Sequence, residues 1–161
     1  MMGPRRQAPN CQLAESSSAD VPASDRCCTY LTQGHQEKLR LCAVLERIAD
    51  SLPAGVDRFQ CLMVAHSLVP ILRACHRLEE DVVFPIAARA SVRQVILTRL
   101  AAEHLEDYSS AEELTEVLLA VGHGQPVENP EAFGYMLRAF FETVRRHVAY
   151  ERDHILPVGM K

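Results

Sequence analysis

The stretch HRLEEDVVFP, residues 76–85, decides the fold, because a second stretch with the same outline, HVAYERDHILP, follows at residues 147–157. Each stretch begins with a His, has a Glu four residues later, and then contains apolar residues and a Pro. Residues i and i+4 of an α-helix lie on the same face, about 6 Å apart. Each stretch therefore predicts a helix that directs an imidazole and a carboxylate into one site.

The composition indicates one ordinary globular domain. The chain has 161 residues, is 48% hydrophobic and 24% charged, and carries a formal net charge of −4. These values exclude the basic excess typical of nucleic-acid binding and the charge runs typical of membrane-surface binding. The N-terminus has no apolar segment of a secretory signal, and no stretch is long and apolar enough to span a membrane. We therefore expect a cytoplasmic protein with no nucleic-acid or membrane partner.

The cysteines do not form a zinc-ribbon pattern, because none of the six lies in a CxxC pair. Three are expected in the helical core: Cys42, Cys61 and Cys75. The other three lie in or beside the N-terminal segment: Cys11, Cys27 and Cys28. A redox role of the adjacent pair Cys27 and Cys28 stays open.

The chain divides into a polar N-terminal segment and a helical domain. Residues 1–28 are rich in Ser, Pro, Ala and Asp and are expected to be flexible. Residues 29–161 show helical periodicity, with four helices expected at about residues 30–51, 57–84, 92–121 and 129–157. The expected starts are caps at Asp57, Ser91 and Asn129, and Pro85 marks an expected end. Pro70 predicts a kink near Ser67 or a break into two helices. The fold class is therefore an all-α, antiparallel up-down four-helix bundle.

Each expected helix carries one His on its apolar stripe, and two helices add a carboxylate. The candidate metal ligands are His35, His76, Glu80, His104, His147 and Glu151. A single His on a stripe is usually a core residue, and a single His–Glu pair is usually a surface pair. Four such His together with two buried carboxylates are not explained in this way, because burying a carboxylate without a cation costs free energy. The set therefore predicts a metal site; the other three His, His66, His123 and His154, are expected to face solvent or to bond locally.

The spacing places all four His at one level of the bundle. His35 and His76 are 41 residues apart, and His104 and His147 are 43 residues apart, with a loop near the middle of each interval. At about 1.5 Å per residue, each arm of these hairpins is roughly 27–30 Å long. The two hairpins therefore contribute two halves of one site. Six donors exceed the four of a tetrahedral zinc site. They suit two octahedral first-row ions bridged by carboxylates, with iron favoured and zinc or manganese also compatible.

Three phrases resemble the hemerythrin-like, or HHE cation-binding, family over residues 29–158. They are HRLEEDVVFP, AEHLEDY at residues 102–108, and HVAYERDHILP. The resemblance implies a non-haem di-iron centre in an up-down bundle, with the four His as terminal ligands. It also implies that Glu80 and Glu151 bridge the irons together with an oxo or hydroxo group. Family members bind oxygen reversibly or are tied to iron, nitric oxide or redox sensing.

The sequence departs from the oxygen carriers of that family on two helices. Those proteins have a second His where this chain has Tyr108, and an Asp one residue beyond the position of Glu151. Tyr108 has three open roles: a phenolate ligand of ferric iron, a hydrogen-bonding partner of a bound ligand, or a core Tyr. Asp107 and Glu79 are spare carboxylates nearby. The departure argues against reversible oxygen carriage.

The function expected from the sequence is a non-haem di-iron protein that binds or senses oxygen, nitric oxide or redox state. The alternative is a metal-stabilised helical module that binds a signalling protein without small-ligand chemistry. An enzyme, such as a di-iron oxidase or a peroxide-reducing protein, is the third class. The sequence favours it least, since it shows no separate catalytic pair, nucleophile or phosphate loop.

Overall fold

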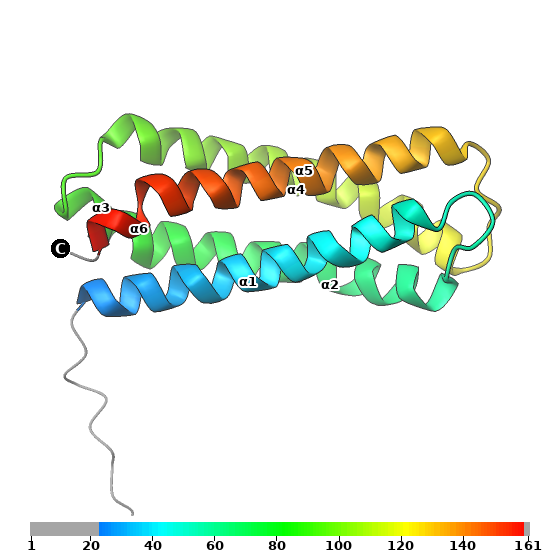
Figure 1. The fold of residues 1–161 in the computed structure, drawn as a ribbon, viewed down its shortest axis with the longest axis horizontal. Coiled ribbons are helices and arrows are strands. Elements are labelled where there is room, and N and C mark those ends of the chain that lie inside the picture. Colours follow the sequence, from blue (N-terminus) through cyan, green and yellow to red (C-terminus); the bar gives the residue numbers. More distant parts are fainter. Residues whose placement is uncertain (1–22, 160–161) are drawn as a thin grey trace, which may run out of the picture.

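The computed structural model describes residues 23–159. Its elements are α1 (Ala23–Asp50), α2 (Arg58–Leu78), the π-helical turn η1 (Glu79–Val83), α3 (Phe84–Arg89), α4 (Gln94–Gly122), α5 (Pro130–His154) and α6 (Leu156–Gly159). The four long helices α1, α2, α4 and α5 run side by side along the long axis of the molecule (Figure 1). The α1–α2 and α4–α5 loops lie at one end of the bundle, and α3 and α6 lie at the other (Figure 1). The predicted all-α up-down bundle is confirmed.

Two of the predicted helix starts are capped as expected. The Asp57 side chain accepts a hydrogen bond from the backbone N–H of Gln60 at 3.1 Å. The Asn129 side chain accepts one from the backbone N–H of Ala132 at 2.9 Å, and Pro130 is the first residue of α5. These side chains satisfy backbone donors that have no partner inside the helix.

Two other boundaries differ from the predictions. The start predicted at Ser91 is wrong: Ser91 has a φ of 72° in the turn after α3, and α4 begins only at Gln94. An N-cap residue typically has extended backbone with a negative φ, so Ser91 cannot cap a helix that starts at Val92. Helix α1 begins at Ala23, so the last residues of the segment expected to be flexible, 1–28, are helical. Residues 1–22, with Cys11, lie outside the described residues.

Neither internal Pro interrupts the helical path from α2 to α3. Helix α2 continues through Pro70, so a break into two helices there does not occur. Pro85 does not end a helix, because it lies in the first turn of α3, where its missing N–H is not needed. The five-residue turn η1 joins α2 to α3 without a loop. The chain therefore stays helical from Arg58 to Arg89.

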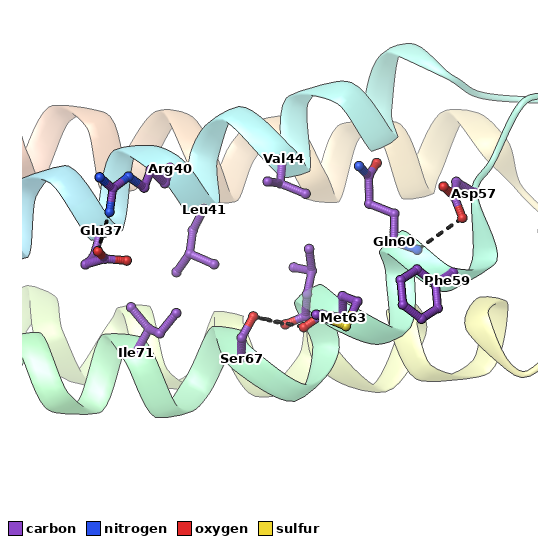
Figure 2. A pocket seen from close by; sticks show the side chains of 11 residues that line it. Glu37, Arg40, Leu41, Val44, Asp57, Phe59, Gln60, Met63, Ser67 and Ile71 are labelled. Atoms are coloured by element: carbon purple, nitrogen blue, oxygen red, sulfur yellow. Dashed lines mark hydrogen bonds and ion pairs between the residues drawn. The ribbon is translucent and has the colours of Figure 1, made fainter.

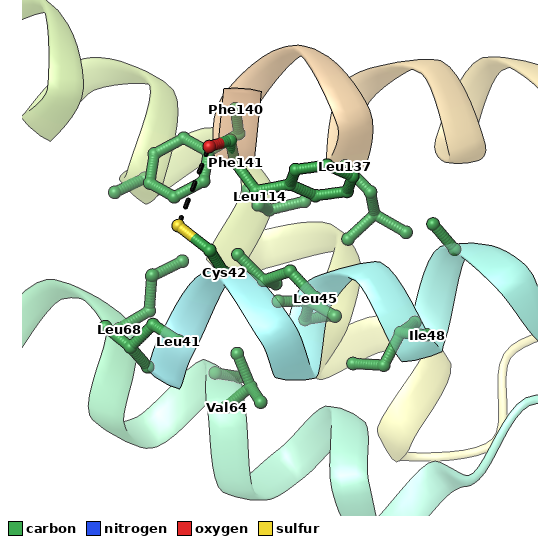
Figure 3. Packing of buried hydrophobic residues seen from close by; sticks show 14 of the residues in the cluster. Leu41, Cys42, Leu45, Ile48, Val64, Leu68, Leu114, Leu137, Phe140 and Phe141 are labelled. Carbon is green, nitrogen blue, oxygen red and sulfur yellow. Dashed lines mark hydrogen bonds between the residues drawn. The ribbon is translucent and has the colours of Figure 1, made fainter. Parts of the chain in front are cut away.

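The interior has two apolar clusters separated by a polar layer. The larger cluster packs residues of all four long helices toward the loop end, including Cys42, Leu45 and Leu137 (Figure 3). The smaller one lies toward α3 and α6 and includes Leu31, Phe84 and Ile155. On each long helix, buried polar residues fall in the sequence between these two sets; we call them the polar layer: His35, Lys38, His76, Glu79, His104, Asp107, His147 and Glu151. The apolar clusters therefore shield this layer from both ends of the bundle.

Among the described residues, no helix combines the length and the apolar character needed to cross a bilayer.

Candidate metal centre

Three imidazoles and one carboxylate converge in the polar layer. We call them the imidazole cluster: His76 from α2, Glu79 from η1, His104 from α4 and His147 from α5. Each offers one ligand atom, and these atoms all lie within 4.8 Å of one another. All four residues are buried, with exposed fractions of 3% or less. The cluster therefore brings together donors that are separated by up to 71 positions in the chain.

Two of these imidazoles have a carboxylate partner on their outer side. Nδ1 of His104 lies 2.6 Å from Oε1 of Glu80, and Nδ1 of His147 lies 2.9 Å from Oε2 of Glu103. A carboxylate partner fixes the proton on Nδ1 and leaves the lone pair of Nε2 free. This carboxylate–histidine arrangement is typical of histidines that bind metal ions.

The inner atoms of the cluster have no hydrogen-bond partners. Both ring nitrogens of His76, Nε2 of His104 and Nε2 of His147 are buried without one. Nε2 of His104 also lies 3.1 Å from Oε2 of Glu79 without hydrogen-bond geometry. Burying polar atoms without partners costs free energy, and native structures rarely leave several together. The donor set therefore fits a cation, which would satisfy these atoms at once.

His76 is held neutral. Burial lowers the pKa of His76, and the neighbouring Lys38 and His104 lower it further, to about 2. Its ring stacks on that of His104, with ring centroids 3.8 Å apart and an interplanar angle of 7°. Its Nε2 also lies 3.8 Å from Oδ2 of Asp107, and burial raises the pKa of that carboxyl. Since a neutral imidazole is the form that binds metals, His76 needs to release no proton to become a ligand.

His35 and Glu151 lie beside the imidazole cluster. Nε2 of His35 is 3.0 Å from Oε2 of Glu151, and Oε1 of Glu151 is 3.4 Å from Nε2 of His147. Burial would raise the pKa of Glu151, but the charge of Lys38 and the nearby rings of His147 and His35 outweigh it and hold the pKa well below its usual range. Glu151 is therefore an ionised carboxylate that connects the His35 side of the layer to the imidazole side.

The sequence predicted that Glu80 would accompany His76 into the site, and the structure places Glu79 there instead. The side chain of Glu79 is 3% exposed, whereas that of Glu80 is 44% exposed and contacts the outer nitrogen of His104. The reason is η1, which starts at Glu79 and whose wider π-helical turn changes the direction of the side chains after it. π-helical turns inside helices occur frequently at functional sites.

Lys38, which is fully buried in the polar layer, was not among the site residues predicted from the sequence. Leu39, the apolar residue next to it in the chain, is 42% exposed instead. The spacing of His35, Lys38 and Cys42, with intervals of three and four residues, contained the signal. A Lys is almost never fully buried unless it is paired, so the pattern alone predicts a surface position for it.

Tyr108 lies at the edge of the cluster. Its ring centroid is 5.1 Å from that of His76, and the residue is partly buried. Burial and the nearby charge of Glu80 raise the pKa of the phenol, so Tyr108 is neutral at physiological pH. His66, His123 and His154 are all exposed, and Nδ1 of His154 bonds the carbonyl oxygen of Tyr150. They lie outside the site, as predicted.

A separate groove runs over the surface between α1 and α2. Figure 2 shows Leu41 and Ile71 along it and the ring of Phe59 near the loop end. Phe59 is 71% exposed and Met63 is 56% exposed. The groove shares no lining residue with the imidazole cluster, so the two features are independent.

The comparisons with known proteins agree with this geometry. The family model of the hemerythrin HHE cation-binding domain matches residues 29–158. No curated protein and no solved structure matches the chain. The matched range contains the whole polar layer.

Proposed function

Because the chain belongs to the hemerythrin HHE cation-binding domain family, we propose that it binds iron in the imidazole cluster and senses oxygen, nitric oxide or redox state through that iron. The observation that carries the proposal is the set of inward nitrogens of His76, His104 and His147, which are buried without partners beside Glu79. A mixed nitrogen and oxygen donor set suits iron, and also manganese and zinc.

The protein side of the proposed chemistry follows from the residues around the cluster. A bound iron would supply a ferrous–ferric couple and an open position for a small ligand. Glu80 and Glu103 orient the two imidazoles that they contact. Leu100 and Val144, at most 1% exposed, adjoin the layer on α4 and α5 and limit the access of water.

The family resemblance implies two irons with bridging carboxylates. Tyr108 has a specific place in the proposal, since it is close enough to His76 to report on the metal. A phenolate ligand of ferric iron would give a strong visible absorption band that Tyr108→Phe abolishes. A weakly coloured protein would instead leave Tyr108 as a neighbour of the site.

The experiment is to purify the full chain aerobically, measure iron per chain, and record the visible spectrum before and after dithionite. Air or nitric oxide is then added to the reduced protein. We expect bound iron whose spectrum changes with each treatment, and loss of that iron in His104→Ala. His154→Ala is the matched control, because His154 is an exposed histidine outside the cluster, and it should retain full iron.

The interaction-module alternative makes the opposite prediction. If the metal is only structural, the bound ion will be insensitive to dithionite, air and nitric oxide. A His76→Ala variant that folds normally without metal and keeps its biological activity would favour this alternative and contradict the sensing proposal.

A further inference from the structure

Lys38 occupies the position between the two buried glutamates of the polar layer. Its Nζ lies 2.7 Å from Oε1 of Glu79 and 3.4 Å from Oε2 of Glu151. The residue is fully buried. The contacts with both carboxylates stabilise the charged form of the amine, so Lys38 is a cation. One fixed positive charge therefore joins the carboxylates of η1 and α5.

We infer that Lys38 takes the place of a second metal ion, so that the polar layer binds one divalent cation, in the imidazole cluster, and not two. The inference rests on the proposed function in so far as the cluster must bind a metal. It differs from the di-iron centre implied by the family resemblance.

The donors on the two sides of the layer support this asymmetry. On the imidazole side, the inner nitrogens of His76, His104 and His147 have no partners. On the other side, Oε2 of Glu151 already accepts from Lys38 and pairs with Nε2 of His35. A second ion at His35 and Glu151 would have to displace a buried ammonium from both of its carboxylates, which leaves a charge without a partner.

The charges of the layer point the same way. Its buried carboxylates, Glu79, Asp107 and Glu151, carry at most three negative charges. Lys38 and one divalent ion together supply three positive charges, which balance them. Two divalent ions together with Lys38 would supply five, and excess charge in a water-poor interior is costly.

The presence of Lys, and not Arg, at position 38 also supports the inference. The chain has 17 Lys and Arg residues, and only two of them, Lys38 and Lys161, are Lys. An ammonium is a compact point charge, whereas a guanidinium is a broad planar fork. The compact group can lie between the two carboxylates in the way that a metal ion would.

The first test counts ions in the wild-type protein. The metal-free full chain is titrated with Fe²⁺ without oxygen, and separately with Mn²⁺, and bound ions per chain are measured by plasma mass spectrometry after desalting. We expect saturation at one ion per chain and a Mn²⁺ electron paramagnetic resonance spectrum of an isolated ion. Saturation at two ions, with the spectrum of a coupled pair, would overturn the inference. Absence of any bound ion would instead overturn the proposed function.

The second test removes the ammonium. Lys38→Ala frees both carboxylates and His35, so saturation should double to two ions per chain. Arg40→Ala is the matched control, since it removes an exposed cation two positions further along α1, and it should stay at one. A folded Lys38→Ala protein that binds only one ion would show that Lys38 is not what excludes the second. If Lys38→Ala does not fold, the wild-type count and spectrum still decide the question.

Discussion

The two copies of the His-x-x-x-Glu phrase behave differently in the folded chain. In α5, the residue four positions after His147 is Glu151, which is fully buried and pairs with His35 and Lys38. In the first copy, the buried carboxylate is Glu79, three positions after His76. Glu80, four positions after His76, contacts the outer side of His104. The same letters therefore give an inner carboxylate in one copy and an outer carboxylate in the other.

The difference teaches that backbone geometry selects among neighbouring candidates. Helix α5 keeps its α-helical turn through Glu151, whereas the first copy enters the π-helical turn η1 at Glu79. The first copy then follows the i, i+3 spacing that His104 and Asp107 also show in the polar layer. The adjacent residues Glu79 and Glu80 therefore have different environments, although both contact the ring of His104, which lies 25 and 24 positions further along the chain.

The largest difference between the copies is expected in stability. Glu151→Gln should lower the free energy of unfolding of the metal-free protein by about 3–5 kcal/mol, because it removes a buried charge partner of both Lys38 and His35. Glu80→Gln should lower it by less than about 1 kcal/mol, since its carboxylate is partly exposed. Urea titrations of both variants measure this, and equal losses would mean that the two glutamates have the same role.

The second difference is expected in metal affinity. Glu80→Gln removes only an outer partner of His104, so binding of Mn²⁺ should weaken roughly 10–100-fold. Glu79→Gln removes a donor of the cluster itself and should weaken binding by more than that. Competition with a chelating indicator gives both affinities. A larger loss in Glu80→Gln would restore Glu80 as the ligand that the sequence predicted.

The smallest difference is expected in the pH dependence of stability, because the pKa values of His76 and His147 are shifted in opposite directions. Burial and Lys38 lower the pKa of His76 to about 2. Burial acts the same way on His147, but the nearby carboxylate of Glu151 outweighs it and raises the pKa overall.

Below pH 6.5, unfolded His76 binds a proton that folded His76 does not, so stability falls with falling pH, by at most about 1.4 kcal/mol per pH unit. The contribution of His147 is complete below pH 6.5 and is lost as the pH rises through its raised pKa. In the metal-free protein, His76→Gln should flatten the acid side of the stability profile, and His147→Gln the alkaline side. Profiles that both variants leave unchanged would show that neither shift exists in solution.

Much of the fold was predictable because it depends on local patterns. The caps at Asp57 and Asn129 are set by residues within three positions of them. The lengths of the hairpin arms predicted that all four His would reach one level of the bundle. His76, His104 and His147 meet in the imidazole cluster, and His35 lies beside it against Glu151. Glu79 and Lys38 were not assigned to the site, because their burial depends on a π-helical turn and on the carboxylates of other helices.

The sequence by itself determined the four long helices, their up-down order, and the level at which their His residues meet, since these follow from periodicity and chain length. Only the tertiary structure decided which donors face one another and which cation lies between the glutamates. The physical reason is that adjacent residues differ by about 100° in direction on a helix. One wider turn, or one long side chain that reaches across the bundle, can therefore change which residues form a site without changing the sequence pattern that predicts it.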